Sequence, residues 1–361
     1  MQNLLFLIQS FSFMISQKQI AKKLGISRSA VAAALNPKSK SRTSHQTLKM
    51  IRETAKKMGY RPNRFAQILV TGKSRLIGVI SQIDALQIGI QRHRYSIQRI
   101  QQKGYQPMIG EVLEGNIELV CQGMLDAKVE GILLANVSLG ENPTKIFLKS
   151  KIPVISLADR IYRNVPHVRA NFYQGMRDLT AHLLEVGHRR FTLVVPEYIP
   201  GGSIEGRVRG FSDVLKEAKI PSSHFSVWKE QSPNSPSYLK PHYLGWKAAT
   251  EILKTKNRPD VILFSNDDWA LGGLRAIFEA GLRVPQDIAV TGFDNAPLSE
   301  YLVSPLTTVA QPVQEMAESA VNLLFQQMEG GKGLMTKKSL IEIPTKLIVR
   351  ESCGASLPRK P

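Results

Sequence analysis

The chain has 361 residues, with 48 Lys and Arg against 29 Asp and Glu and a formal net charge of +19. At about 100–200 residues per domain, this length predicts two or three compact units. A hydrophobic fraction of 43% excludes broad disorder. The only cysteines, Cys121 and Cys353, are too far apart to suggest a disulfide framework or a cysteine zinc site, so a reducing compartment fits.

The positive charge is concentrated near the N-terminus. Residues 1–75 contain 15 Lys and Arg and one acid, Glu53, which gives +14. The remaining 286 residues contain 33 bases and 28 acids, a net +5. This distribution predicts a small basic unit attached to a nearly neutral body, and such a unit suits a nucleic acid or an anionic membrane as its partner.

The first fifteen residues are mostly apolar. They are too short for a membrane-spanning helix, which needs about 20 apolar residues. They also lack the basic start and small-residue cleavage site of a signal peptide. We interpret residues 1–15 as an apolar extension, with Met1 and Met14 as alternative starts, and expect no membrane partner.

Residues 16–61 begin with two short helical patterns. Ser16 is suited to cap the first helix and Gly25 to end it, and Ser27 is suited to cap a second helix over 28–35. Two short helices joined by a glycine turn predict a helix-turn-helix.

A third helical pattern begins after Ser44 and runs up to Gly59. Any three-helix bundle with a solvated basic face would show the same periodicity. Eleven bases and one acid between residues 18 and 57 favour a polyanion partner instead, because that much like charge repels itself.

These residues resemble the DNA-binding head of the LacI/GalR family of bacterial transcriptional regulators. The resemblance is carried by the run Ile20–Val31, by Asn36, and by a G-Y-x-P-N-x-x-A-x-x-L motif from Gly59 to Leu69. It implies that the second helix enters the major groove of double-stranded operator DNA. It also implies that a hinge helix within residues 62–74 folds on DNA and wedges a leucine into the minor groove.

The resemblance further implies DNA contacts by residues at helix starts and in the hinge, namely Ser16, Ser27, Arg28, Ser29, Asn63 and Leu69. Arg28 could read guanine through two hydrogen bonds, and the alternative is a phosphate contact. Ala33 and Gln67 stand where the family commonly has arginine, so the preferred operator should differ from the family's usual sites.

The body alternates buried strands with amphipathic helices. The predicted strands are 76–80, 131–134, 153–155, 191–195, 261–264 and 288–290, and the helices include 175–186, 206–218 and 270–280. This alternation predicts an α/β fold with parallel sheets, and the length favours two lobes with a cleft.

The resemblance extends over this body, through motifs at 185–190, 266–272, 281–285, 290–294, 305–309 and 344–352. The implied fold is an all-α helix-turn-helix head joined by a hinge helix to a two-lobed, periplasmic-binding-protein-like α/β domain over 75–361. That domain would bind an effector and form a homodimer.

Four residues are candidates for the effector site. Asn266 and Asp294 follow predicted strands, where open α/β sheets bind ligands, and the alternatives are an Asx turn and a loop cap. Arg207 matches the family's effector-binding arginine, with a surface ion pair as the alternative. Asp159 could match the family's ligand aspartate, although it is displaced by one residue.

Two departures leave the ligand open. Residues 82–88 replace the family's aromatic N-P-F-F stretch, and residues 168–171 replace its V-x-x-D-N motif. One side of the pocket should therefore be unusual.

Nothing in the sequence indicates catalysis, a metal site or a cofactor. Gly72-Lys73-Ser74 only mimics the end of a P-loop, because the first glycine is missing and a strand follows. We expect a cytoplasmic, nucleoid-associated regulator, most simply a repressor, controlled by a sugar or related metabolite. The alternatives are a secreted periplasmic-type sugar-binding protein and an α/β enzyme.

Overall fold

The computed structural model describes residues 15–35, 44–60, 72–81, 87–113, 116–135, 146–147, 149–157, 165–196, 202–230, 240–330 and 340–355. The chain divides into two compact units, Met1–Ser74 and Arg75–Pro361. The finer division of the first unit at 15 and 61 remains a prediction. The proposed hinge helix and linker at 62–74 lie outside the described residues as far as residue 71, and the proposed extension at 1–15 does so as far as residue 14.

The first unit contains three helices, α2 (Gln17–Leu24), α3 (Arg28–Leu35) and α4 (His45–Lys57). A capping box starts α2: the backbone N–H of Ser16 donates to the Gln19 side chain at 2.7 Å, and Gln19 N–H donates back to the Ser16 hydroxyl at 3.3 Å. Gly25 ends α2 at φ +65°, in the left-handed region that glycine adopts without strain. The predicted caps and turn are therefore confirmed.

A small apolar core holds the three helices together. Its buried members come from every helix: Ile20, Ala21, Val31, Ala34, Ile51 and Ala55. Arg52 of α4 also donates to the carbonyl of Ala34 at 3.2 Å, which gives an acceptor in the last turn of α3 a partner. The short helices thus fix one another, because helices of eight residues are marginal alone.

The second unit is built on two parallel sheets, which confirms the predicted fold class. The first sheet has six strands in the order β11-β5-β4-β3-β1-β2. Their bounds are β1 (Leu76–Ser81), β2 (Gln106–Glu111), β3 (Gly131–Ala135), β4 (Val154–Leu157), β5 (His167–Ala170) and β11 (Leu340–Ile343). The second sheet has the order β7-β6-β8-β9. It comprises β6 (Phe191–Val195), β7 (Phe225–Lys229), β8 (Val261–Phe264) and β9 (Ala289–Thr291).

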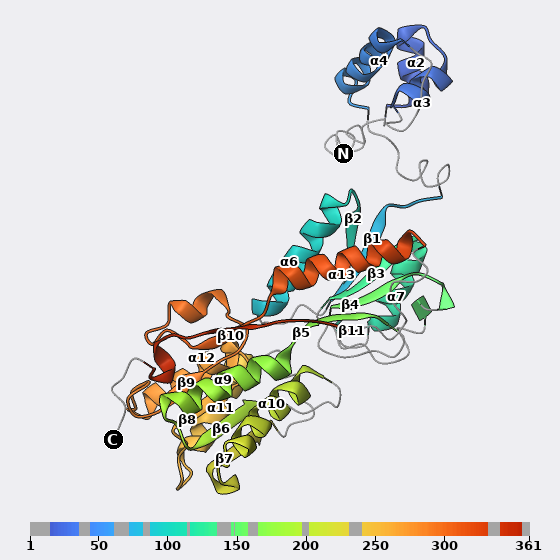
Figure 1. Cartoon of the computed structure of the whole chain (residues 1–361). Helices are drawn as coiled ribbons and strands as arrows, with labels where there is room; N and C mark the ends of the chain where they lie inside the picture. Colours follow the sequence, from blue (N-terminus) through green and yellow to red (C-terminus); the bar gives the residue numbers. More distant parts are fainter. Residues whose placement is uncertain are drawn as a thin grey trace, which may run out of the picture. The chain divides into compact units, whose positions relative to one another are not determined.

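Helices cover both faces of each sheet. In the first lobe, α6 and α13 lie side by side over one face and α7 covers the other (Figure 1). In the second lobe, α9 and α10 form one pair and α11 and α12 another. The helix bounds are α6 (Gln87–Gln102), α7 (Ile117–Asp126), α9 (Phe172–Val186), α10 (Ser203–Glu217), α11 (Pro241–Leu253), α12 (Asp267–Glu279) and α13 (Val313–Met328).

The chain passes between the lobes three times. It leaves the first sheet after β5, returns through β10 (Thr308–Ala310) to α13, and passes again from β11 to β12 (Lys346–Ile348). β10 and β12 pair antiparallel, so two of the connections are hydrogen-bonded to each other. Three short 3₁₀ helices complete the described elements, at Ser222–His224, Pro297–Glu300 (η2) and Glu351–Cys353.

The predicted strands lie where expected to within a few residues, whereas the three named helices start three residues before their predicted positions. Asn171 and Asn266 explain two of these differences: their side-chain oxygens accept from Gln174 N–H at 2.9 Å and Trp269 N–H at 2.8 Å. A polar capping turn has no apolar periodicity, so a pattern-based boundary falls after it.

Candidate functional site

The second helix of the basic unit begins with exposed polar side chains. The Ser27 hydroxyl accepts from Ala30 N–H at 3.1 Å and lies 2.9 Å from the Ser29 hydroxyl, so it caps α3. Arg28 and Ser29 are exposed on the first turn. The start of α3 thus presents a guanidinium, a hydroxyl and the positive end of the helix dipole, a combination that suits an anionic partner.

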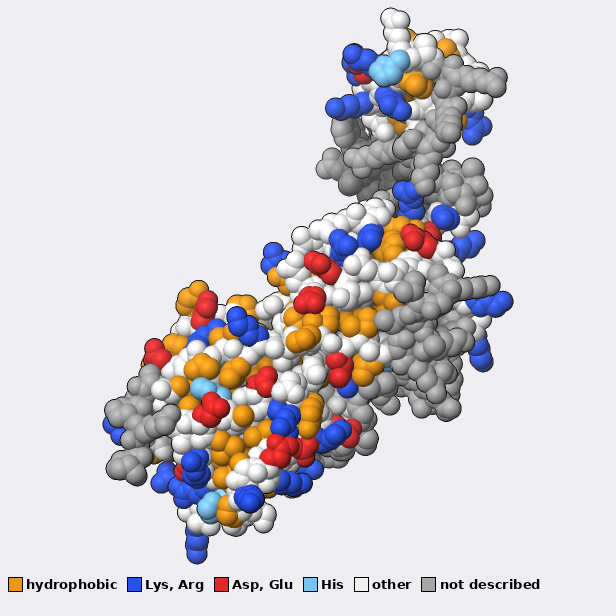
Figure 2. Space-filling view, viewed as in Figure 1, with side chains coloured by type: hydrophobic (Ala, Val, Ile, Leu, Met, Phe, Trp, Pro, Cys, Tyr) orange, Lys and Arg blue, Asp and Glu red, His pale blue; other side chains and the backbone are white. Residues whose placement is uncertain are grey.

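Positive charge dominates the surface of the same unit. All eight bases among residues 15–35 and 44–60 are exposed, and the one acid there is Glu53. Figure 2 shows Lys and Arg side chains on several parts of this unit, whereas both signs of charge mix over the second unit. Ser16 lies at the start of α2 as a helix cap. Asn63 and Leu69 lie outside the described residues.

In the second unit, polar side chains gather where β8 and β9 end. Asn266, Asp267 and Asp268 follow β8 and open α12, and Asp294 follows β9. All four are buried, with exposed fractions of 3–9%. The carboxyl ends of parallel strands meet at one edge of a sheet, which brings these residues together.

Asp294 has a constrained backbone. Its φ is +116° and that of Asn295 is +53°, both in the left-handed region that non-glycine residues seldom adopt. Asp294 N–H donates to the carbonyl of Val309 at 2.8 Å, which ties this turn to β10. Backbone strain held in place by surrounding hydrogen bonds is characteristic of functional sites.

Arg207 lies in the interior, which excludes the surface ion pair considered from the sequence. Its side chain is 4% exposed and its Nη2 lies 3.7 Å from Asp294 Oδ1. The guanidinium carbon lies 4.4 Å from the ring centres of both Phe172 and Phe293. Two of the four predicted effector residues are thus in direct contact.

Two further residues extend this cluster, and sequence reasoning missed both. The Gln311 carboxamide donates to Asp294 Oδ1 at 2.5 Å and accepts from Arg92 Nη2 at 2.7 Å. Arg92 belongs to α6 of the first lobe and is 1% exposed. The sequence carries no signal of this pairing, because only the folded chain shows that Arg92 is buried and needs built partners.

Asp267 is a buried acid of the cluster, 5% exposed. Burial raises the pKa of its carboxyl well above the usual value, and the nearby Asp294 carboxylate raises it further. Its oxygens accept from Thr308 Oγ1 and from Ala296 N–H, both at 2.6 Å. A Cβ on Gly292 would collide with the same carboxyl group, so glycine is required there.

The other two predicted effector residues, Asn266 and Asp159, are not part of the contact between Arg207 and Asp294. The Asn266 side-chain oxygen caps α12, which matches the local-turn alternative for that atom. Asp159 lies outside the described residues. Asp268 was not predicted; it accepts from Gln87 N–H of α6 at 3.3 Å and lies 3.4 Å from His242 Nε2, so it also connects the lobes.

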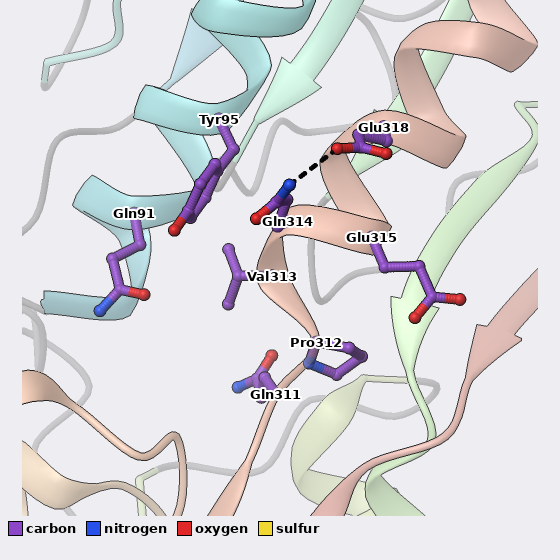
Figure 3. A pocket seen from close by; sticks show the side chains of 8 residues that line it. All are labelled: Gln91, Tyr95, Gln311, Pro312, Val313, Gln314, Glu315 and Glu318. Atoms are coloured by element: carbon purple, nitrogen blue, oxygen red, sulfur yellow. Dashed lines mark hydrogen bonds between the residues drawn. The ribbon is translucent and has the colours of Figure 1, made fainter.

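A cavity of about 440 Å³ adjoins the cluster between α6 and the start of α13. Gln91 and Tyr95 line it from α6, and Gln311 to Gln314, Glu315 and Glu318 line it from the other side (Figure 3). It shares Gln311 with the buried cluster.

Within the part of the chain that the structure describes, no group of three or more His, Cys, Asp or Glu side chains could hold a metal ion. Among the same residues, every helix is too short or too polar to cross a bilayer.

Comparisons with known proteins agree with this architecture. Residues 180–353 match the model of the periplasmic binding protein-like domain. The chain is 29% identical to the probable HTH-type transcriptional repressor ExuR of Bacillus subtilis (strain 168), over 94% of this chain and 98% of that protein. It is 27% identical to the HTH-type transcriptional repressor PurR of Escherichia coli O139:H28 (strain E24377A / ETEC), over 94% and 97%.

Solved structures show the same fold. The lac repressor dimer bound to operator and the anti-inducer ONPF superposes with a TM-score of 0.79 at 24% identity, over 94% of this chain and 99% of that one. A complex of the transcriptional regulator CelR with cellobiose gives a TM-score of 0.67 at 21% identity, over the same shares. The helix-turn-helix unit, the two-lobed body and these full-length relatives together support the LacI/GalR family of bacterial transcriptional regulators for this chain.

Proposed function

We propose that this protein is a sequence-specific DNA-binding transcriptional regulator, a repressor, whose affinity for its operator is controlled by a small sugar-like ligand. The observation that carries the proposal is the presence on one chain of a basic helix-turn-helix unit and a buried polar cluster between two lobes. The basic helix-turn-helix unit suits a polyanion such as DNA, and the buried polar cluster suits a small polar molecule.

The helical unit supports the DNA-binding half of the proposal. Eight exposed bases against one acid provide the electrostatic attraction for phosphates, which is independent of sequence. Arg28 and Ser29 at the start of α3 are the side chains we assign to base edges in the major groove. Ser16 and Ser27, at helix starts, are assigned to the DNA backbone.

The polar cluster supports the ligand-binding half. Arg207, Asp294 and Asn266 offer guanidinium donors, carboxylate acceptors and an amide, which together can fix hydroxyl groups of a sugar. Phe172 and Phe293 add apolar ring surface beside Arg207. Such a mixture of apolar walls and a few placed polar groups is typical of small-molecule sites. We also assign Asp159 to this site from the resemblance alone.

The active form is proposed to be a homodimer. Each short hinge, with Asn63 at its start and Leu69 as its wedge, would be ordered only against DNA and a second hinge. The second lobe also exposes apolar side chains at and just after η2, namely Leu298, Tyr301 and Val303. Exposed apolar groups of this kind suit a contact with a second copy.

The two sites are coupled in this proposal through the lobes. Ligand bound between the lobes would stabilise one lobe arrangement, and that arrangement would favour or disfavour the paired hinges. Coupling of this kind is reciprocal, so DNA must change ligand affinity by the same factor. A secreted sugar-binding protein is not favoured, since the basic unit would have no role there. We place the regulator in the bacterial cytoplasm, on the nucleoid, acting as a binding protein without catalysis.

The test begins with selection of genomic fragments bound by the intact protein, followed by footprinting. If four of the eight exposed bases of each head contact phosphates, a dimer makes eight contacts and log K should fall with log salt at a slope of about −7. A salt-independent affinity would contradict the proposal.

Substitutions then separate base reading from general attraction. Arg28→Ala should cost about 1–3 kcal/mol at the selected site and relax preference at one base position. Lys216→Ala, which removes an exposed charge from the end of α10 in the body, is the matched control and should change nothing. An equal loss for Arg28→Ala on random DNA would reduce Arg28 to a phosphate contact.

A further inference from the structure

Arg92 is an unusual residue for its position. It lies on α6 of the first lobe, yet its side chain is 1% exposed, as buried as the apolar core. Enclosing a guanidinium costs several kcal/mol unless charged or hydrogen-bonding partners surround it. One such partner is Gln311, whose side-chain oxygen accepts from Arg92 Nη2 at 2.7 Å, and Arg92 has further polar contacts.

A continuous set of contacts joins Arg92 to the effector cluster of the other lobe. Gln311 donates to Asp294 at 2.5 Å, and Asp294 lies 3.7 Å from Arg207. Two buried guanidinium groups, one from each lobe, therefore converge on a single carboxylate with a neutral carboxamide between them. Arg207 Nη2 and Asp294 Oδ1 lie farther apart than a hydrogen bond, so this contact is an ion pair, and both residues make further contacts.

The surroundings of Arg207 orient its donors. Phe172 and Phe293 stand on the guanidinium at 4.4 Å each, and their rings are tilted 42° to each other. Rings over the faces of a guanidinium leave its N–H groups pointing outward in the plane. That geometry matches the two oxygens of a carboxylate or phosphate.

The neighbouring acids differ in how far their negative charge balances the two arginines. Burial raises the pKa of Asp267, which favours its neutral form. Asp268 is engaged by Gln87 and His242. Among the described residues, Asp294 is the acid that contacts Arg207, and it is joined to Arg92 only through Gln311.

We propose that the ligand held between the lobes carries an anionic group, a carboxylate or a phosphate on a sugar-like body, and that Arg92 is the residue that selects it. The inference rests on the proposed function, since it names the class of ligand for the same site. The anion would bind beside Gln311, within reach of both Arg92 and Arg207, so that one group of the ligand binds both lobes. A neutral sugar would leave the buried guanidinium with a poorer partner, and buried polar sites discriminate strongly against such analogues.

The test measures binding of matched pairs by calorimetry and thermal unfolding of the full-length protein. The pairs are glucuronate with glucose, galacturonate with galactose, and glucose 6-phosphate with glucose. At least one anion should bind about 10-fold or more tightly than its neutral counterpart. Comparison of the uronate pairs with the phosphate pair shows whether the site binds a carboxylate or a phosphate.

Two variants assign the preference to Arg92. Arg92→Met should remove most of the ratio between the anion and its neutral partner. Arg99→Met is the matched control: it lies on the same helix, where Arg99 Nη2 donates to Asn322 at 2.9 Å, and should keep the ratio. Gln311→Glu should also weaken anion binding, because it adds a carboxylate within reach of Arg92. This variant replaces Arg92→Met in the test if Arg92→Met does not fold.

Three results would overturn the inference: neutral sugars that bind as tightly as the anions, no binding by any anion of the series, or an unchanged ratio in Arg92→Met. Release of the operator by a neutral sugar would overturn this inference and leave the proposed function standing. Failure to bind any selected DNA would instead contradict the proposed function.

Discussion

The helical unit should lose its fold when one core side chain is shortened. Ile51 of α4 is fully buried against Ile20 and Val31 from the other two helices. Truncation of such a side chain to alanine costs about 2–5 kcal/mol, including the cavity left behind. At about 0.05–0.15 kcal/mol per residue, a unit that spans residues 16–60 has about 2–7 kcal/mol in total. Ile51→Ala should therefore remove most of its stability and leave the second unit folded.

Hydrogen exchange of the full-length protein, read by mass spectrometry, checks this prediction. In Ile51→Ala, peptides from α2, α3 and α4 should lose protection, whereas peptides from β6 and β8 should keep it. Affinity for operator DNA should fall with the folded fraction of the head. Met50→Ala is the control, because Met50 is the exposed neighbour on the same helix. Equal loss of protection in both units would refute the claim that the head is a separate cooperative unit.

Three further substitutions test the body. Asp260 accepts three hydrogen bonds of 2.9–3.1 Å from Arg190 and a fourth from the backbone N–H of Arg189. These bonds outweigh the effect of burial and lower the pKa of Asp260. Asp260→Ala should cost about 2–3 kcal/mol in urea unfolding at neutral pH. That cost should shrink as pH falls below 3.8 through the lower folded pKa, and a constant difference would contradict it. Gly245→Ala should lower the melting temperature, because its Cβ would collide with a backbone carbonyl of α12, whereas Gly123→Ala, in open space on α7, should not. Val303→Asp should shift sedimentation towards monomer, and an intact dimer would move the proposed interface elsewhere.

The regular elements followed from the sequence because their signals are local. Some features depend on neighbouring residues alone, namely the helix caps at Ser16 and Ser27, the glycine turn at Gly25 and short apolar strands such as 191–195. The structure places these where the patterns indicated. Helix starts were missed where an asparagine cap precedes the apolar periodicity, as at Asn171.

The site was only partly predictable, because its contacts join distant segments. Arg207 and Asp294 could be proposed from motif and strand position, and they do meet. Arg92 and Gln311 could not, since they are 219 residues apart and pair only after the chain has crossed between lobes. Asp267 carried a strand-end signal equal to that of Asn266, and only its hydrogen bonds with Ala296 and Thr308 distinguish it.

The central claim is that one chain couples DNA binding to ligand binding, and a linkage measurement tests it most directly. The affinity of the full-length protein for its selected operator is measured with and without saturating ligand, and ligand affinity is measured with and without operator. The account predicts that each partner changes the affinity of the other by one common factor of about 5–150. A ligand that binds tightly and leaves operator affinity unchanged would contradict it.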